Sequence, residues 1–276
     1  MTTQHVVVGV DGSLIAVRAL DRAADEALSR GATLRIVFAV PDRDEAGPVL
    51  ASAAARIRAR HPGLRVVTTA SEAGAVEALV RESEGAALTV VGNRGLGGFT
   101  GLLLGSVSLH LAAHTRSPLL VVRGDHPCDG GRDVLLGLAG DADEDAAAYA
   151  FQEAARRGAR LRVLHSWIHR HVTPELPSLV PATSPGQREL ARVDAAEEAV
   201  PRFSMAELHE RYPEVEVEAR TVRTSPAHVL LEATRGAGLA VVGVHHHAGR
   251  PRPSLGPVAH TLLHRSHCPV LLVPNG

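Results

Sequence analysis

The amino-acid sequence contains two copies of one unit, and this repeat limits the folds that the chain can adopt. The segment VVVGVDGS at residues 6–13 returns as VLLGLAGD at 134–141, and VVGNRGLGG returns as VVGVHHHAG. The closing segments SPLLVV and CPVLLV also correspond. Because 276 residues are enough for two domains of ordinary size, we expect each copy to form a domain with its own core. The expected domains are residues 1–124 and 132–276, joined by a linker at 125–131.

Within each copy, apolar strand-like runs alternate with segments of helical periodicity. The predicted strands are residues 6–10, 34–40, 64–69, 87–91 and 119–122 in the first copy and 134–138, 160–165, 215–221, 239–242 and 270–273 in the second. The predicted helices include one with Val17, Leu20, Ala24, Ala27 and Leu28 on its buried face and a long one at residues 188–212. Continuously apolar strands are typical of parallel sheets that helices cover on both faces. The expected fold class is therefore α/β, with two tandem open parallel-sheet sandwiches and helices on both faces.

Composition and charge exclude several kinds of partner and site. The formal net charge of −1 gives no general attraction to nucleic acid or to anionic membranes, so neither is expected as a partner. No stretch approaches the roughly 20 apolar residues that span a bilayer, and the start MTTQH lacks the features of a signal peptide. Cys128 and Cys268 have no metal or disulfide spacing, so we expect structural thiols. The expected location is cytoplasmic.

Lysine does not occur in the chain, and all 29 basic residues are arginine. A P-loop lysine, a Schiff-base lysine and a lysine general base are therefore excluded. Any phosphate must be bound by backbone amides, by arginine or through a metal ion.

A glycine loop after the fourth predicted strand carries most of the functional information. In VVGNRGLGGFTGLLLGSV, Gly92 and Gly95 open the loop, and Gly105 and Ser106 start the next helix. Glycines let a phosphate approach the backbone closely, and a helix N-terminus attracts anions. The alternative is an ordinary glycine-rich connection, with Ser106 only capping its helix. The full order of strand, loop and helix favours a nucleotide or phosphate site.

Asp11 follows the first strand, at the sheet end where the glycine loop is also expected. Gly9 and Val10 are expected beside the loop for the same reason. The Asp11 carboxylate either accepts hydrogen bonds from a ribose or holds a metal ion such as Mg²⁺ between phosphates. Alternatively, Asp-Gly-Ser is simply a turn before a helix. Arg94, in the middle of the loop, either pairs with a phosphate or is solvated.

These motifs, in this order, resemble those of a universal stress protein with two tandem domains, and the resemblance covers nearly the whole chain. It implies five-stranded parallel sheets ordered 3-2-1-4-5 that bind ATP or a related adenine nucleotide. Asp11 is implied near the ribose and Val40 near adenine. The residues implied around the phosphates are Gly92, Gly95, Gly98, Gly105, Ser106 and Val107. The resemblance also implies pairing through the fifth strands, which would make the two halves an internal pseudo-dimer, and it leaves a homodimer open.

The second copy departs from this pattern at each chemical position. Aligned without gaps, Asp11 becomes Ala139, Gly95 becomes His246 and Ser106 becomes Pro257. Proline removes both a hydroxyl and an amide donor, so we do not expect this copy to bind ATP in the family manner. The run of histidines at 245–247 invites a metal-site interpretation, but consecutive loop residues point in different directions.

Three functional hypotheses remain. The first is a regulator of the stress response that binds ATP in its N-terminal domain and catalyses little or no hydrolysis. The second is a slow, metal-dependent ATPase that uses Asp11, although the glycine loop has no histidine pair and the sequence offers no paired nucleophile and base. The third is a scaffold that binds no nucleotide and acts by pairing with other proteins.

Overall fold

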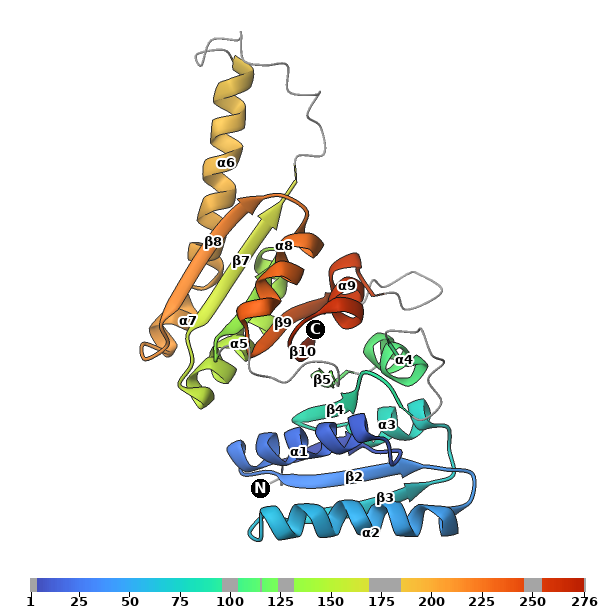
Figure 1. Ribbon diagram of the computed structural model, residues 1–276. Coiled ribbons are helices and arrows are strands. Elements are labelled where there is room, and N and C mark those ends of the chain that lie inside the picture. The colour runs from blue at the N-terminus through green and yellow to red at the C-terminus, as the bar shows by residue number, and fades with distance from the viewer. Residues whose placement is uncertain are drawn as a thin grey trace.

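The computed structural model describes residues 4–95, 104–114, 116–123, 132–168, 185–245 and 255–275. These residues form one ten-stranded sheet with helices on both faces (Figure 1). The strand order is β3-β2-β1-β4-β5-β10-β9-β6-β7-β8. None of the described helices has the length and apolar character needed to cross a membrane. The expected linker at 125–131 lies outside the described residues.

Strands and helices alternate along both halves of the chain. The first half contains β1 (His5–Gly9), α1 (Leu14–Ser29), β2 (Thr33–Ala39), α2 (Arg43–Arg60), β3 (Val66–Ser71), α3 (Ala75–Ser83), β4 (Leu88–Gly92), α4 (Ser106–His114) and β5 (Leu119–Val122). The second half contains β6 (Val134–Leu138), the short 3-10 helix η1 (Asp141–Asp143), α5 (Glu144–Arg157), β7 (Leu161–Trp167), α6 (Pro185–Ser204), α7 (Ala206–Arg211), β8 (Val217–Arg223), α8 (Pro226–Ala233), η2 (Thr234–Gly236), β9 (Leu239–His245), α9 (Pro257–Arg265) and β10 (Val270–Asn275).

Each half has the strand order 3-2-1-4-5 with all of its own strands parallel, which confirms the predicted fold class. The two sheets are not separate, however, because the fifth strands β5 and β10 pair antiparallel, with Leu120 opposite Leu271. The strands of the two halves consequently run in opposite directions. Their carboxyl ends, where ligands of open α/β sheets bind, point to opposite edges of the continuous sheet.

The core consists of two apolar layers, one on each face of the sheet. Val6 and Val8 of β1 face the layer under α1, α2 and α5, whereas Val7 faces the layer under α3, α4, α8 and α9. Side chains alternate between faces along a strand, so a strand covered on both sides is apolar at every position. This is the physical reason for the unbroken valine and leucine runs in the sequence.

Two predicted helices differ from the observed ones. In α1, Val17 is only half-buried and Leu28 is 44% exposed, whereas the buried face is formed mainly by alanines such as Ala19 and Ala23. Leu20, Ala24 and Ala27 are buried as predicted. Small side chains let the helix backbone approach the sheet closely, so the buried face centres on the alanines and leaves Leu28 at its edge. The helix predicted at 188–212 is interrupted at Met205, which leaves helical geometry (φ −117°, ψ 2°) and is buried in the core.

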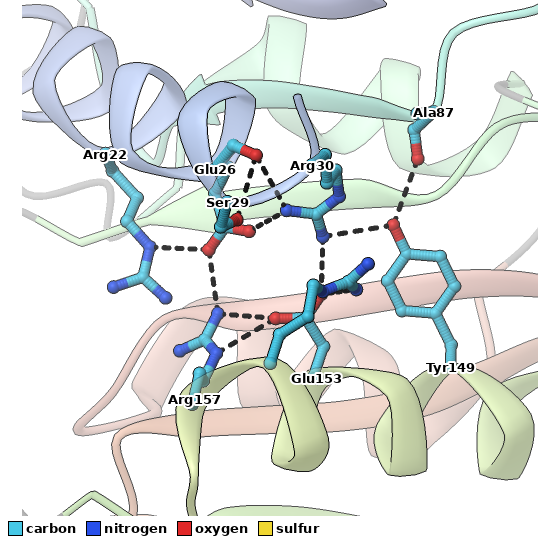
Figure 2. Close-up of polar contacts among 9 residues, drawn as sticks. Arg22, Glu26, Ser29, Arg30, Ala87, Tyr149, Glu153 and Arg157 are labelled. Atoms are coloured by element: carbon cyan, nitrogen blue, oxygen red, sulfur yellow. Dashed lines mark hydrogen bonds and ion pairs between the residues drawn. The ribbon is translucent and has the colours of Figure 1, made fainter. Parts of the chain in front are cut away.

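A ring of buried ion pairs joins α1 to α5 across the two halves (Figure 2). We call Glu26, Arg30, Glu153 and Arg157 the α1–α5 ion ring. Each arginine contacts both glutamates, and Arg22 and Arg156 add one further contact each. The nearby hydroxyl of Tyr149 donates to the carbonyl of Ala87 at 3.0 Å, a second link between the halves.

Candidate functional site

A pocket of about 360–470 Å³ lies at the carboxyl ends of the strands in each half, and the larger one belongs to the first half. This first-half pocket, of about 470 Å³, lies between the ends of β1, β2 and β4 and the start of α4. It brings together most of the predicted site residues, namely Gly9, Val10, Asp11, Gly92, Arg94, Gly95, Gly105, Ser106 and Val107. Residues 104–108 and 91–95 face each other here although the loop between them lies outside the described residues.

Two predicted residues are not placed in the wall of this pocket. Gly98 lies outside the described residues. Beyond the end of β2, Val40 donates its backbone N–H to the carbonyl of Ser71 at 2.9 Å and packs against the core, while Phe38 and Ala39 line the pocket. The contact of Val40 with adenine therefore stays a prediction.

A tight turn holds Asp11 at the rim of the first-half pocket. Gly12 adopts the left-handed region (φ +82°), which favours glycine. The Asp11 carboxylate accepts the backbone N–H of Ser13 at 3.0 Å, and the Ser13 hydroxyl accepts the N–H of Ala16 at 3.1 Å to cap α1. The turn interpretation of Asp-Gly-Ser is therefore correct, and it does not compete with a ligand role, because the same carboxylate also lines the pocket.

Asp11 and Gly95 lie directly against each other. A Cβ atom added at Gly95 would lie only 2.2 Å from Oδ2 of Asp11. Any other residue at 95 would therefore have to displace this carboxylate. The glycine is explained by the approach of Asp11 as much as by the approach of a phosphate, a reason that motif spacing alone does not reveal.

The start of α4 forms another part of the pocket wall, near Gly95, because a Cβ atom added at Gly105 would lie 4.0 Å from the Gly95 nitrogen. The Gly105 amide is not offered to a ligand, because it donates to the carbonyl of Asn93 at 2.7 Å and closes the base of the glycine loop. The donors that can bind an anion are the N–H groups of the first helical turn, which begins at Ser106. These N–H groups have no acceptor within the helix itself.

Ser108 is a pocket residue that the sequence analysis missed. It is buried, lines the pocket, and donates its hydroxyl to the carbonyl of Gly92 at 2.7 Å. This hydrogen bond fixes the first turn of α4 against the end of β4. In the sequence, its position two residues after Ser106, in the first turn of the helix, could have indicated that it lines the site.

The second-half pocket, of about 360 Å³, lies at the equivalent place between the ends of β6, β7 and β9 and the start of α9. Ala139, Gly256 and Pro257 line it, as the alignment of the two copies predicts. Asp143 was not predicted there. It comes from η1, accepts the N–H of Ala139 through Oδ2 at 2.6 Å, and lies against Gly243, where an added Cβ would be 2.3 Å from Oδ1. It takes the place of Ile15 in the first copy, which packs on Gly92 in the same way, so an apolar position of the first half holds an acid in the second.

The histidines do not form a metal site in the described part of the chain, where no group of three or more potential ligands converges. His246 and His247 lie outside it. The rings of His260 and His264 are in contact, with centroids 4.4 Å apart and planes tilted by 36°. Burial, together with the charges of His260 and Arg123, lowers the pKa of His264. Arg123, which follows β5, donates to the carbonyl of Leu263 at 3.2 Å, so this corner is an interface between the halves.

The sequence model of the universal stress protein family matches residues 2–123 and again 132–274. The chain belongs to the universal stress protein family. A relative named universal stress protein from Mycolicibacterium smegmatis is 34% identical over 296 residues, which cover 99% of this chain and 97% of the relative. The universal stress protein Rv2005c of Mycobacterium tuberculosis is 32% identical over 98% of this chain and 97% of its own length.

Solved universal stress proteins share the fold. The crystal structure of one from Archaeoglobus fulgidus superposes with a TM-score of 0.68 at 18% identity, covering 100% of both chains. Its full coverage means that the likeness extends over both halves of this universal stress protein.

Proposed function

We propose that this universal stress protein is a regulator that binds ATP, or a related adenine nucleotide, in the first-half pocket. One observation carries the proposal. The Asp11 carboxylate, packed against Gly95, and the first turn of α4 at Ser106 line the same pocket. A hydrogen-bond acceptor for a ribose and an anion-binding helix N-terminus are thereby combined in one cavity.

The walls and size of the first-half pocket suit the two ends of a nucleotide. Val37, Phe38 and Leu79 provide an apolar wall for a base, and the pocket volume of about 470 Å³ lies within the range of small-molecule sites. At the other end, the first-turn amides of α4 and the guanidinium of Arg94 would receive phosphates. In its alternative role, Asp11 would hold Mg²⁺ in place of the ribose, and the ion would supply positive charge to the phosphates.

The residues that line the first-half pocket favour a regulatory role over a catalytic one. Among the described lining residues, the ionisable side chains are Asp11 and Arg94, and neither adjoins a serine or cysteine nucleophile with a base. Binding is therefore favoured over turnover, and the bound nucleotide would stabilise the first half and the sheet that it shares with the second.

Equilibrium dialysis with ATP on two matched variants tests the site. Gly105→Glu places a carboxylate at the mouth of the first-half pocket, where an added Cβ meets nothing closer than Asn93 O at 3.4 Å. Gly256→Glu makes the same change at the equivalent residue of the second half, where nothing lies within 4 Å. We expect Gly105→Glu to weaken ATP binding at least about tenfold and Gly256→Glu to leave it unchanged. Equal binding by both variants and the wild type, or binding by none, contradicts the proposal.

A slow ATPase is the second candidate, favoured only by the position of Asp11 at the rim of the pocket. Steady Mg²⁺-dependent release of ADP that Asp11→Ala abolishes would support it. If ATP is unchanged after a long incubation while dialysis still shows binding, the protein is not an ATPase and the regulator hypothesis is supported.

A further inference from the structure

The second-half pocket has the frame of a family ligand site but different chemistry. Both pockets are built on the ends of strands one, two and four and the start of the helix after strand four. The polar groups of the first pocket are replaced by apolar ones in the second. The replaced pairs, first half then second half, are Asp11 and Ala139, Ser106 and Pro257, and Ser108 and Ala259.

These replacements weaken the means of binding an anion. Pro257 is the first residue of α9 and has no N–H, so the helix N-terminus lacks one of the donors that Ser106 provides in α4. Val244 and Ala259 offer neither a donor nor an acceptor in their side chains. What remains is a largely apolar cavity of about 360 Å³ at the edge of the sheet opposite the first-half pocket.

One charged group has been added to this cavity. Asp143 is only 3% exposed and is the single ionisable side chain among the described lining residues. The amide of Ala139 donates to its Oδ2, and Nδ2 of Asn275 lies 3.3 Å from its Oδ1 and 2.6 Å from the carbonyl of Ala142. The carboxylate is thus held in place against Gly243 by groups from both ends of the second half.

A carboxylate at this position selects the charge of a ligand. A phosphate that entered the second-half pocket would meet this negative group at the end of β9, and the two would repel. A protonated amine would instead be attracted, and its apolar body would be buried by side chains such as Leu164, Leu230 and Val258. Desolvation by the apolar walls strengthens both effects.

We propose that the second-half pocket is a separate binding site for a small molecule with an apolar body and a protonated amine, which pairs with Asp143. The two halves of the protein then bind ligands of opposite charge at opposite edges of one sheet. This site does not depend on nucleotide binding in the first half.

Two probes with the same ring and chain length test the selection of charge. Tryptamine carries an ammonium group where indole-3-propionate carries a carboxylate. Dissociation constants would be measured on the full chain by ligand-observed NMR titration, with and without saturating ATP. We expect the wild type to prefer tryptamine at least about tenfold, with or without ATP.

Three variants complete the experiment. Asp143→Asn keeps the shape of the side chain and should reduce the preference to less than about twofold. Asp11→Asn, its matched control in the first half, should leave the preference unchanged. Val258→Trp should fill the cavity and abolish binding of both probes. This variant keeps the proposal testable if circular dichroism shows that the Asp143→Asn protein is unfolded. Absence of tryptamine binding, equal binding of both probes, or tryptamine binding that survives Val258→Trp overturns the proposal, as does an undiminished preference in a folded Asp143→Asn protein.

Discussion

Arg157 of α5 donates to the carboxylate of Glu26 in α1 at 2.7 Å, and this contact joins the two halves of the chain (Figure 2). In the opposite direction, Arg30 at the end of α1 pairs with Glu153 of α5. Both copies of the repeat carry the same Glu-x-x-x-Arg-Gly-Ala segment, so these four side chains are equivalent in pairs. The repeat therefore uses one motif twice to build a pseudo-symmetric interface next to the antiparallel β5–β10 pair.

Removal of one carboxylate from the α1–α5 ion ring should be costly. The side chain of Glu153 is 2% exposed and pairs with Arg30, Arg156 and Arg157, so Glu153→Gln would leave the buried Arg30 and its two partly buried neighbours with one anion fewer. We expect a loss of about 3–5 kcal/mol in the free energy of unfolding, measured with urea. Glu232→Gln, which removes the partner of an exposed pair with Arg235, is the control and should cause no measurable change. Equal stability of the two variants would contradict a structural role for the ring.

The ion ring should also make stability depend on acid pH. Burial raises the pKa of Glu26, but the attraction of Arg22, Arg157 and Arg30 outweighs it and the net pKa is lowered. A carboxyl whose pKa is lower in the folded state stabilises fully above its unfolded pKa of about 4.3, and this stabilisation is lost as pH falls through the folded value. Urea unfolding between pH 7 and 3 should therefore show a steeper loss of stability below about pH 4.3 in the wild type than in Glu26→Gln. Parallel curves would argue against this coupling.

The contact between Asp11 and Gly95 predicts a mutation that impairs binding and spares the fold. A Cβ at residue 95 would lie 2.2 Å from Asp11 Oδ2, so Gly95→Ala must push the carboxylate aside. We expect the dissociation constant for ATP to rise about tenfold in isothermal titration calorimetry. Gly63→Ala, where an added Cβ meets nothing within 4 Å, should bind as the wild type does. An unchanged dissociation constant for ATP in Gly95→Ala would show that the position of the Asp11 carboxylate does not affect binding of the ligand.

Two glycines should respond to alanine with opposite signs. Gly47 lies inside α2 with nothing within 4 Å of an added Cβ, so Gly47→Ala should stabilise the protein by about 0.5–1 kcal/mol. At Gly137 in β6 the added Cβ would lie 2.9 Å from Leu230 and 3.1 Å from Val242. Gly137→Ala should therefore destabilise by about 1–3 kcal/mol. Thermal unfolding of the two variants side by side checks the prediction, and a shared direction of change would refute it.

Local patterns explain how much of the fold was accessible from the sequence. Val6–Val8 of β1 and the whole of β6 carry no polar residue, because helices cover both faces of each strand, and this predicted buried parallel strands. Ala24 and Ala27 were predicted on the buried face of α1, but Ala19, Ala23 and the break at Met205 were not, because they depend on how closely an element packs on the sheet. Helical periodicity alone does not report that distance.

The sequence by itself determined the repeat, the kinds and order of the elements, and the position of the glycine loop, since all of these follow from short-range composition and periodicity. The resemblance to the family implied that the fifth strands pair, but only the tertiary structure decided that β5 and β10 do so antiparallel with Leu120 opposite Leu271, that Asp11 rests on Gly95, and that Asp143 occupies the second-half pocket. These features depend on contacts between residues far apart in the chain. Their geometry depends on how strands pair and how closely backbones approach, which no spacing along the chain records.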